Sequence, residues 1–310
     1  MLLISISAVT PNAVFSQAWN PPKGTAYVKF SYGHVTAADQ YTFHGTTTDY
    51  IQGLPGDTYR DRSLYAYTEI GLTDNVSLVV SVPYKRTFVR DHAFRFRIFG
   101  FGTATVGGRF SLSPLLGLEN SRNAVAANVT AFVPLGYTRN YTPSAGSGQL
   151  GVETSISFGH SFYPLPAYVQ VATGYRLRSS QYFLSAAADC RIGSDIHCSS
   201  DSKPDFGDEL VVRAETGISP FNGLVLVQLL SSLTWSLKEP MVGFSAINPV
   251  PTHQRYVKTG VGAAIYPFVL LHKPGLSSFG ISAQYFITPY GRNSINSRDV
   301  FLGVELKPSF

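Results

Sequence analysis

The last twelve residues of the chain place an apolar side chain at every second position. One face holds Val300, Leu302, Val304, Leu306, Pro308 and Phe310, and the other holds Asp299, Phe301, Gly303, Glu305, Lys307 and Ser309. A period of two is that of a β-strand, because successive side chains of a strand point to opposite faces. An apolar face of this length is typical of a strand that presents one side to lipid.

The same period recurs along the chain and predicts twelve strands. They lie near residues 24–34, 62–72, 76–88, 101–113, 124–137, 149–161, 167–178, 208–219, 224–237, 254–266, 276–288 and 299–310. These lengths suit tilted membrane-crossing strands of about 9 to 11 residues with some extension. We therefore predict an all-β fold, a membrane-spanning antiparallel up-and-down β-barrel of about 12 strands, with 10 or 14 strands as alternatives.

Composition points the same way. Only 14% of the residues are charged, against roughly a quarter in a typical soluble protein. No run approaches the roughly 18 apolar residues of a membrane-spanning helix, which leaves a closed barrel as the way to satisfy backbone groups in lipid. The net charge of +5 shows no cluster along the sequence and does not indicate nucleic acid as a partner.

The chain is expected to hold one barrel domain, residues 19–310, after an apolar and uncharged stretch at 1–18. That stretch resembles a secretory signal peptide, and the alternative is a hydrophobic first strand. About six residues would separate the cleavage site from the first strand, so we expect no N-terminal plug. Cys190 and Cys198 are predicted to form a disulfide in an oxidising periplasm, with two free thiols as the alternative.

The connections predict which end of the barrel faces outward. Short turns near residues 73–75, 163–166 and 220–223 alternate with long stretches at 35–61, 179–207 and 238–253. Bacterial barrels have short periplasmic turns and longer external loops, so we expect an outer-membrane protein with both termini in the periplasm.

Aromatic side chains are expected to mark the outer lipid boundary. This girdle consists of Tyr32, Tyr84, Tyr137, Tyr175, Trp235 and Tyr285. The surrounding partners would be outer-membrane lipid and lipopolysaccharide. Phe310 resembles the terminal signal read by the barrel-assembly machinery.

The opposite strand faces carry ionisable residues that we assign to the lumen. They are Lys29, Glu69, Lys85, Arg109, Glu153, Arg176, Arg213, Glu215, Lys258 and Glu305. Mixed charges suit a hydrated channel that contacts a solute. The alternative is a network of salt bridges that holds the barrel in shape.

The first external connection is too aromatic for a purely solvated loop. Its apolar and aromatic residues are Tyr41, Phe43, His44, Tyr50, Ile51, Leu54 and Tyr59. We expect this loop to fold over or into the mouth and form an apolar vestibule for a small solute. Packing against lipopolysaccharide or a neighbouring protein is the alternative.

No pattern in the chain supports catalysis. A nucleophile elbow, a zinc-binding helix and a phosphate-cradling loop are all missing from the sequence. His160 and Ser161 are adjacent, so on a strand they point to opposite faces. We therefore predict no enzyme activity, no metal site and no cofactor.

Four motifs carry a resemblance to a known family. They are YTEIGLTDN at 67–75, SVPY at 81–84, GFGTATVGGRF at 100–110 and FVPLGY at 132–137. Together they resemble the outer-membrane family named for the meta pathway of phenol degradation. The resemblance implies a barrel transporter associated with hydrophobic or aromatic compounds.

Our leading hypothesis is therefore passive uptake of small hydrophobic or aromatic molecules. The first alternative is a structural or interaction barrel that displays its loops. The second is a lipid-modifying enzyme of the outer membrane.

Overall fold

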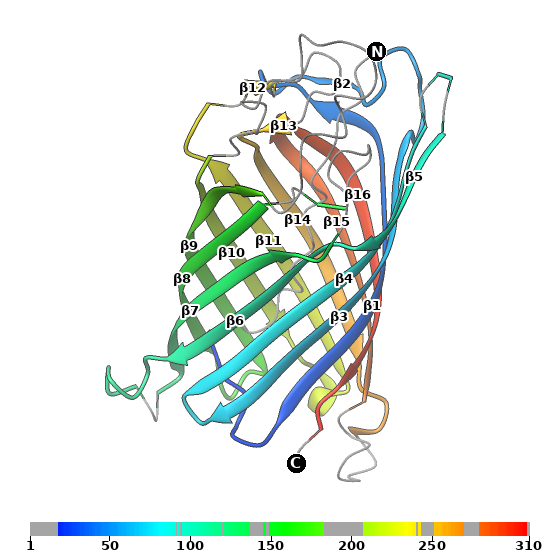
Figure 1. Cartoon of the computed structure of the whole chain (residues 1–310). Helices are drawn as coiled ribbons and strands as arrows, with labels where there is room; N and C mark the ends of the chain where they lie inside the picture. Colours follow the sequence, from blue (N-terminus) through cyan, green and yellow to red (C-terminus); the bar gives the residue numbers. More distant parts are fainter. Residues whose placement is uncertain are drawn as a thin grey trace.

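In a computed structural model, the chain forms a closed antiparallel β-barrel (Figure 1). The structure describes residues 18–90, 92–93, 95–118, 121–136, 145–146, 149–182, 207–239, 241–242, 251–269 and 279–308. The wall consists of β1 (Ala26–Tyr41), β3 (Tyr59–Thr73), β4 (Val76–Arg90), β6 (Thr103–Ser111), β7 (Asn123–Pro134), β8 (Gln149–Ser161), β9 (Ala167–Tyr182), β10 (Glu209–Ile218), β11 (Val225–Ser236), β14 (Arg255–Ile265), β15 (Gly280–Arg292) and β16 (Ser294–Leu306). Each strand pairs with the next, and β16 pairs with β1 to close the wall. The predicted twelve-stranded up-and-down barrel is confirmed.

Two further strands pair with the wall beyond these twelve. β2 (Thr47–Asp49) pairs with β1, and β5 (Arg95–Phe101) pairs with β4. A separate hairpin joins β12 (Met241–Val242) to β13 (Pro251–Thr252). A short 3₁₀ turn lies at Phe221–Gly223. In that part of the chain, no helix is long and apolar enough to cross a bilayer.

The two ends of the barrel differ in their connections. At one end, which we call the turn end, residues 74–75 join β3 to β4 and residues 162–166 join β8 to β9. The Ala26 N–H donates to the Pro308 carbonyl at this end, so the start of β1 and the end of β16 lie together there. The opposite end, the loop end, carries β2, β12 and β13 (Figure 1).

One side of the wall rises higher at the loop end than the sequence predicts. β1 continues to Tyr41 and β3 begins at Tyr59, although 35–61 is predicted to be a loop. β15 and β16 are joined by Asn293 alone, in a left-handed conformation (φ 55°), where residues 289–298 are predicted to be a connection. The predicted strands have the length that is needed to cross a membrane, whereas the hydrogen-bonded ladders of β1, β3, β15 and β16 are longer.

The wall has an apolar outer face and a polar inner face. Leu64, Ile156 and Leu229 are each 58% exposed on the outside, on three separated strands. Polar and charged side chains of the same strands, such as Ser63, Ser157 and Thr234, are buried on the inside. A continuous exposed apolar surface of this kind suits contact with lipid.

The predicted girdle residues differ in their surroundings. Tyr32, Tyr84 and Tyr285 lie on the outer face with 41–43% of their surface exposed. The Tyr175 hydroxyl donates to Asp208 at 2.7 Å, and the Trp235 ring lies 4.7 Å from the Arg255 guanidinium. Tyr137 and Phe310 lie outside the described residues.

Candidate functional site

The ten ionisable residues assigned to the lumen all lie on the inner face of the barrel. In the structure, each contacts at least one polar partner inside the barrel. These contacts form four groups, described in turn below, and they are dominated by carboxylates paired with arginine or lysine. The charges of the interior are therefore paired within separate groups rather than free.

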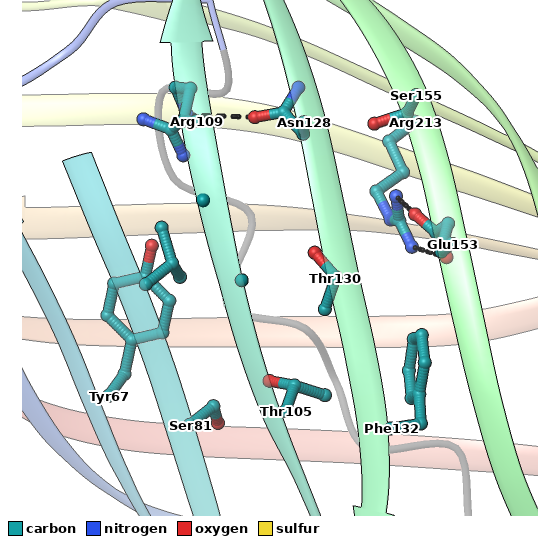
Figure 2. Close-up of a pocket in the computed structure, with 13 residues that line it drawn as sticks. Tyr67, Ser81, Thr105, Arg109, Asn128, Thr130, Phe132, Glu153, Ser155 and Arg213 are labelled. Carbon is teal, nitrogen blue, oxygen red and sulfur yellow. Dashed lines mark hydrogen bonds and ion pairs between the residues drawn. The ribbon is translucent and has the colours of Figure 1, made fainter. Parts of the chain in front are cut away.

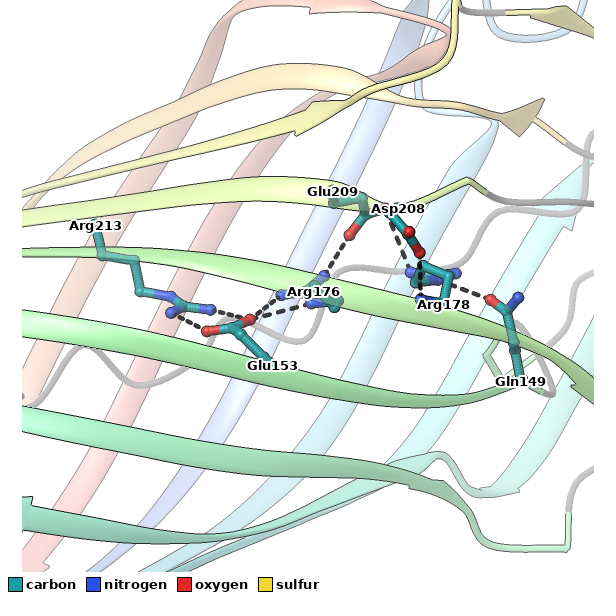
Figure 3. Close-up of polar contacts among 7 residues, drawn as sticks. All are labelled: Gln149, Glu153, Arg176, Arg178, Asp208, Glu209 and Arg213. Carbon is teal, nitrogen blue, oxygen red and sulfur yellow. Dashed lines mark hydrogen bonds and ion pairs between the residues drawn. The ribbon is translucent and has the colours of Figure 1, made fainter.

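The largest group lies on β8, β9 and β10 (Figure 3). Glu153 accepts hydrogen bonds from Arg176 at 2.8 Å and from Arg213 at 2.5 Å. Arg176 also bonds Glu209 at 2.7 Å, and Arg178 contacts the same carboxylate at 3.3 Å. Three arginines thus face two glutamates, and the Asp208 carboxylate beside them accepts the backbone N–H of Arg178 at 2.9 Å.

The register explains how Glu153 and Arg213 meet although β9 lies between their strands. Arg213 pairs with Ala172 of β9, and Glu153 pairs with Arg176 of the same strand. The small Ala172 side chain is buried at 3% exposure and leaves room above it. The Arg213 side chain therefore reaches across β9 to the carboxylate.

A second group lies near the turn end. Arg109 bonds Glu69 at 2.5 Å, and Lys29 lies 3.1 Å from Glu305. Glu215 accepts hydrogen bonds from Gln228 at 2.7 Å, from Gln170 at 3.0 Å and from the Tyr168 hydroxyl. Its carboxylate is therefore held by neutral donors rather than by a bonded cation.

Two remaining pairs involve carboxylates that the sequence reasoning did not assign to the lumen. Lys85 bonds Asp61 at 2.8 Å, and Lys258 bonds Asp299. Asp61 shares its strand face with Glu69, but it fell in the stretch predicted to be a loop. The strand parity of residue 61 would have indicated this side chain if the strand had been extended.

An apolar stripe follows the inner wall opposite the arginines. Near mid-height it consists of Tyr65, Leu230, Phe286 and Phe301, all buried. Val35 packs against this cluster and also against a second one nearer the loop end, so the two are continuous. The sequence did not predict the stripe, because its aromatic members share the inner faces with the charged residues that mark the lumen.

Two glycines make room for the stripe. A Cβ at Gly33 would lie 2.5 Å from the Phe301 ring, and one at Gly260 would lie 2.5 Å from the Phe286 ring. The rings therefore lie flat over bare backbone of the neighbouring strands. Tyr65 and Phe286 each contact Phe301 edge-on, with ring centroids 5.9 and 6.1 Å apart.

The residues predicted to form a vestibule separate into two sets. Tyr50, Ile51, Leu54 and Tyr59 join Ala37 and Val89 in the second apolar cluster, at the loop end. Burial raises the pKa of the Tyr50 phenol well above its usual value. Phe43 and His44 are exposed and stack on each other, while the Tyr41 hydroxyl donates to the Thr288 carbonyl at 2.7 Å.

The chain before β1 enters the barrel at the turn end, contrary to the expectation of no N-terminal plug. The Trp19 carbonyl accepts a hydrogen bond from Arg109 at 2.9 Å, and the Trp19 ring packs edge-on against Tyr168. A Cβ at Gly159 would lie 2.5 Å from the Trp19 ring. The wall therefore has a glycine where the indole lies, which length alone could not reveal.

The described part of the barrel interior includes two cavities that bear on a solute. A small one of about 80 Å³ lies among the polar side chains of Figure 2, between Tyr67, Thr130, Phe132 and Arg213. A larger one of about 650 Å³ opens at the turn end. Its aromatic wall comprises Trp19, Tyr27, Tyr168 and Tyr266, and Glu215 and Glu305 provide carboxylates.

The described residues contain no group of three or more His, Cys, Asp or Glu side chains arranged to hold a metal ion. Cys190 and Cys198, and with them the predicted disulfide, lie outside the described residues. The groups that the lumen offers to a solute are thus side-chain hydrogen bonds, charges and aromatic rings.

Comparison with known proteins gives a likeness in structure rather than in sequence. No protein-family model matches the chain, and no curated protein matches it in sequence. A solved outer membrane channel from Pseudomonas putida F1 has a TM-score of 0.67 at 12% identity, covering 97% of this chain and 100% of that chain. The NanC porin has a TM-score of 0.50 at 5% identity, covering 91% of this chain and 100% of that chain. The chain thus has the fold of outer-membrane barrels.

Proposed function

We propose that this protein is an outer-membrane channel for the passive uptake of small hydrophobic or aromatic molecules. The observation that carries the proposal is the division of the lumen into two unlike walls. The apolar stripe runs along β1, β3, β15 and β16, with Leu230 added from β11, and the arginine–glutamate network lies on β8 to β10.

The two walls suit a solute with an apolar body and a small polar group. An aromatic ring on the stripe would lie against Tyr65, Phe286 and Phe301, where contact between aromatic rings is favourable. A hydroxyl or carboxylate on the same solute would point toward the donors of Arg176 and Arg213. The chamber at the turn end then offers a second aromatic surface before release.

The direction of uptake follows from the unequal ends of the barrel. Bacterial barrels keep short turns in the periplasm and longer loops outside. On this basis the loop end is the entrance, and the turn end, with the start of β1 and the end of β16, lies in the periplasm.

Permeability measurements in liposomes would test the proposal. Wild-type protein should admit a small phenol faster than a sugar of equal size. Replacing Phe286 and Phe301 by Gln makes the stripe polar and should lower the ratio of phenol to sugar flux. Phe110→Gln is the matched control, because Phe110 is 43% exposed on the outer face.

The outcome that contradicts the proposal is equally specific. Liposomes that contain correctly folded barrel yet take up neither solute faster than protein-free liposomes would exclude a channel. An unchanged flux ratio in the Phe286→Gln, Phe301→Gln variant would show that the stripe does not select the solute.

A further inference from the structure

Seven arginines gather on one patch of the outer surface, near the loop end. We call them the outer arginine patch, and they are Arg60, Arg62, Arg86, Arg90, Arg95, Arg97 and Arg298, all exposed. They come from β3, β4, β5 and β16. Arg86, Arg90, Arg95 and Arg97 lie within twelve residues of the chain, contrary to the prediction of unclustered charge, and the folded sheet brings Arg60, Arg62 and Arg298 beside them.

The strand register arranges this patch in rows above an apolar row. The apolar row is Leu302, Tyr32, Leu64, Tyr84 and Phe101, which pair in that order from β16 to β5. Two residues further toward the loop end, His34 pairs with Arg62 and Arg86 pairs with Phe99. The next row holds Arg298, Thr36, Arg60, Phe88 and Arg97. On the outer face, the side chains thus change from apolar to arginine over two residues of a strand, as from Leu64 to Arg62 and from Tyr84 to Arg86.

Two guanidinium groups of the patch, those of Arg86 and Arg97, lie over aromatic rings. Arg86 and Arg97 each lie 5.0–5.6 Å from the ring centres of both Phe88 and Phe99. None of the seven arginines forms a salt bridge within the described part of the chain, although the arginines inside the barrel do. Seven positive charges at this spacing repel one another, and an external anion would relieve that repulsion.

The height of the patch identifies the kind of anion. Acyl chains that cover Leu64, Tyr84 and Phe101 would end beside the first arginine row, so the anion that meets it belongs to a lipid headgroup. Guanidinium groups bind phosphate in a bidentate geometry. Several phosphates on one headgroup would fit arginines from adjacent strands better than a single phosphate would.

We propose that the outer arginine patch binds the phosphorylated headgroup of a lipid in the leaflet around the loop end. Its acyl chains lie on the apolar row of β1, β3, β4, β5 and β16. The bound lipid is a fixed part of the protein's surroundings and does not pass through the lumen. The inference is independent of the proposed channel function, because the patch is on the outside of the wall.

Native mass spectrometry of the detergent-solubilised barrel would test it. The probes are lipid A with two phosphates, lipid A with its phosphates removed, and phosphatidylethanolamine. We expect lipid A to bind at least about tenfold more tightly than the other two, since each arginine near a lipid surface contributes about 1 kcal/mol. A variant with Arg60, Arg62, Arg86 and Arg97 replaced by Gln should lose that preference.

A control variant separates local from general charge effects. Arg122→Gln with Lys23→Gln removes exposed charge at the turn end and should leave lipid A binding unchanged. Heat-modified mobility on gels and circular dichroism would establish that each variant is folded, and a second variant with only Arg62 and Arg86 replaced serves if the first does not fold.

Three results would overturn the proposal. They are equal binding of phosphorylated and dephosphorylated lipid A, unchanged binding by the patch variants, and binding of soluble pyrophosphate as tight as that of lipid A. The last would assign the patch to a free polyphosphate instead of a lipid.

Discussion

Arginines inside and outside this barrel are held in opposite ways. Arg176 and Arg213 are largely buried and bond Glu153, whereas Arg62 and Arg86 are exposed on the outer face and meet no carboxylate in the described structure. The difference comes from strand parity, because neighbouring positions on one strand point to opposite faces. Inside, the arginines connect strands through carboxylates, and outside they have no carboxylate partner among the described residues.

Removing a carboxylate from the interior should have the largest effect. Glu153→Gln would leave Arg176 and Arg213 buried without their shared anion, and we expect the free energy of unfolding to fall by about 3–5 kcal/mol. Denaturant titration of the barrel in detergent would measure it. Asp57→Asn is the matched control, since that carboxylate is exposed and forms no salt bridge in the described structure, and its loss should cost below about 1 kcal/mol. Equal losses of unfolding free energy in the two variants would show that buried and exposed carboxylates stabilise the barrel alike.

A double substitution would show whether the barrel loses stability because an ion pair is missing or because one buried charge is left unpaired. Lys85→Met leaves Asp61 buried and unpaired, with an expected loss of about 3 kcal/mol. Lys85→Met with Asp61→Leu removes both charges, and we expect most of that loss to be recovered. A double variant as unstable as the single one would show that the pair itself, not the unpaired charge, determines stability.

A bulky residue at Gly159 would test the interior position of the chain before β1, which Arg109 also holds. Leu at this position overlaps the Trp19 ring, and overpacking of this kind costs about 1–3 kcal/mol. Displacing the indole should also raise single-channel conductance in planar bilayers. Adding Trp19→Ala to the Gly159→Leu variant should remove the overlap and restore stability. A double variant that stays as unstable as Gly159→Leu would show that the overlap with Trp19 is not the cause of the loss.

The smallest effect is expected on the outside. Arg62→Gln should change the free energy of unfolding in lipid-free detergent by less than about 0.5 kcal/mol, because the side chain is exposed and has no carboxylate partner in the described structure. Thermal unfolding monitored by circular dichroism would check this. A loss as large as that of Glu153→Gln would mean that inner and outer arginines stabilise the barrel alike.

The strands could be predicted from the sequence because apolar and polar side chains alternate within each strand. Residue 153 and residue 213 fall on inward faces by parity alone, and both lie in the barrel interior. Their contact could not be predicted, because it depends on the register of β8, β9 and β10 and on the small residue at 172.

Features beyond the membrane were harder to predict for a different reason. The lengths expected of β1 and β16 came from membrane thickness, which places no limit on a ladder that continues in water. Part of the outer arginine patch could be predicted, because Arg86, Arg90, Arg95 and Arg97 lie within twelve residues of the chain. Its extension to Arg60, Arg62 and Arg298 could not, because it depends on the register of β16, β1, β3 and β4.

The pairing of β1 with β16, which we call the seam, closes the barrel, and it continues to Tyr41 and Ser294 at the loop end. The contact of Tyr41 with Ser294 closes a loop of about 250 residues, whereas the turn between β3 and β4 closes one of about two. Loop entropy rises by about 0.6 kcal/mol for each doubling of length, so the seam starts at a disadvantage of about 4 kcal/mol. The extra rungs of ladder from Thr36 to Tyr41 therefore lie at the one junction that has to offset the entropy of nearly the whole chain.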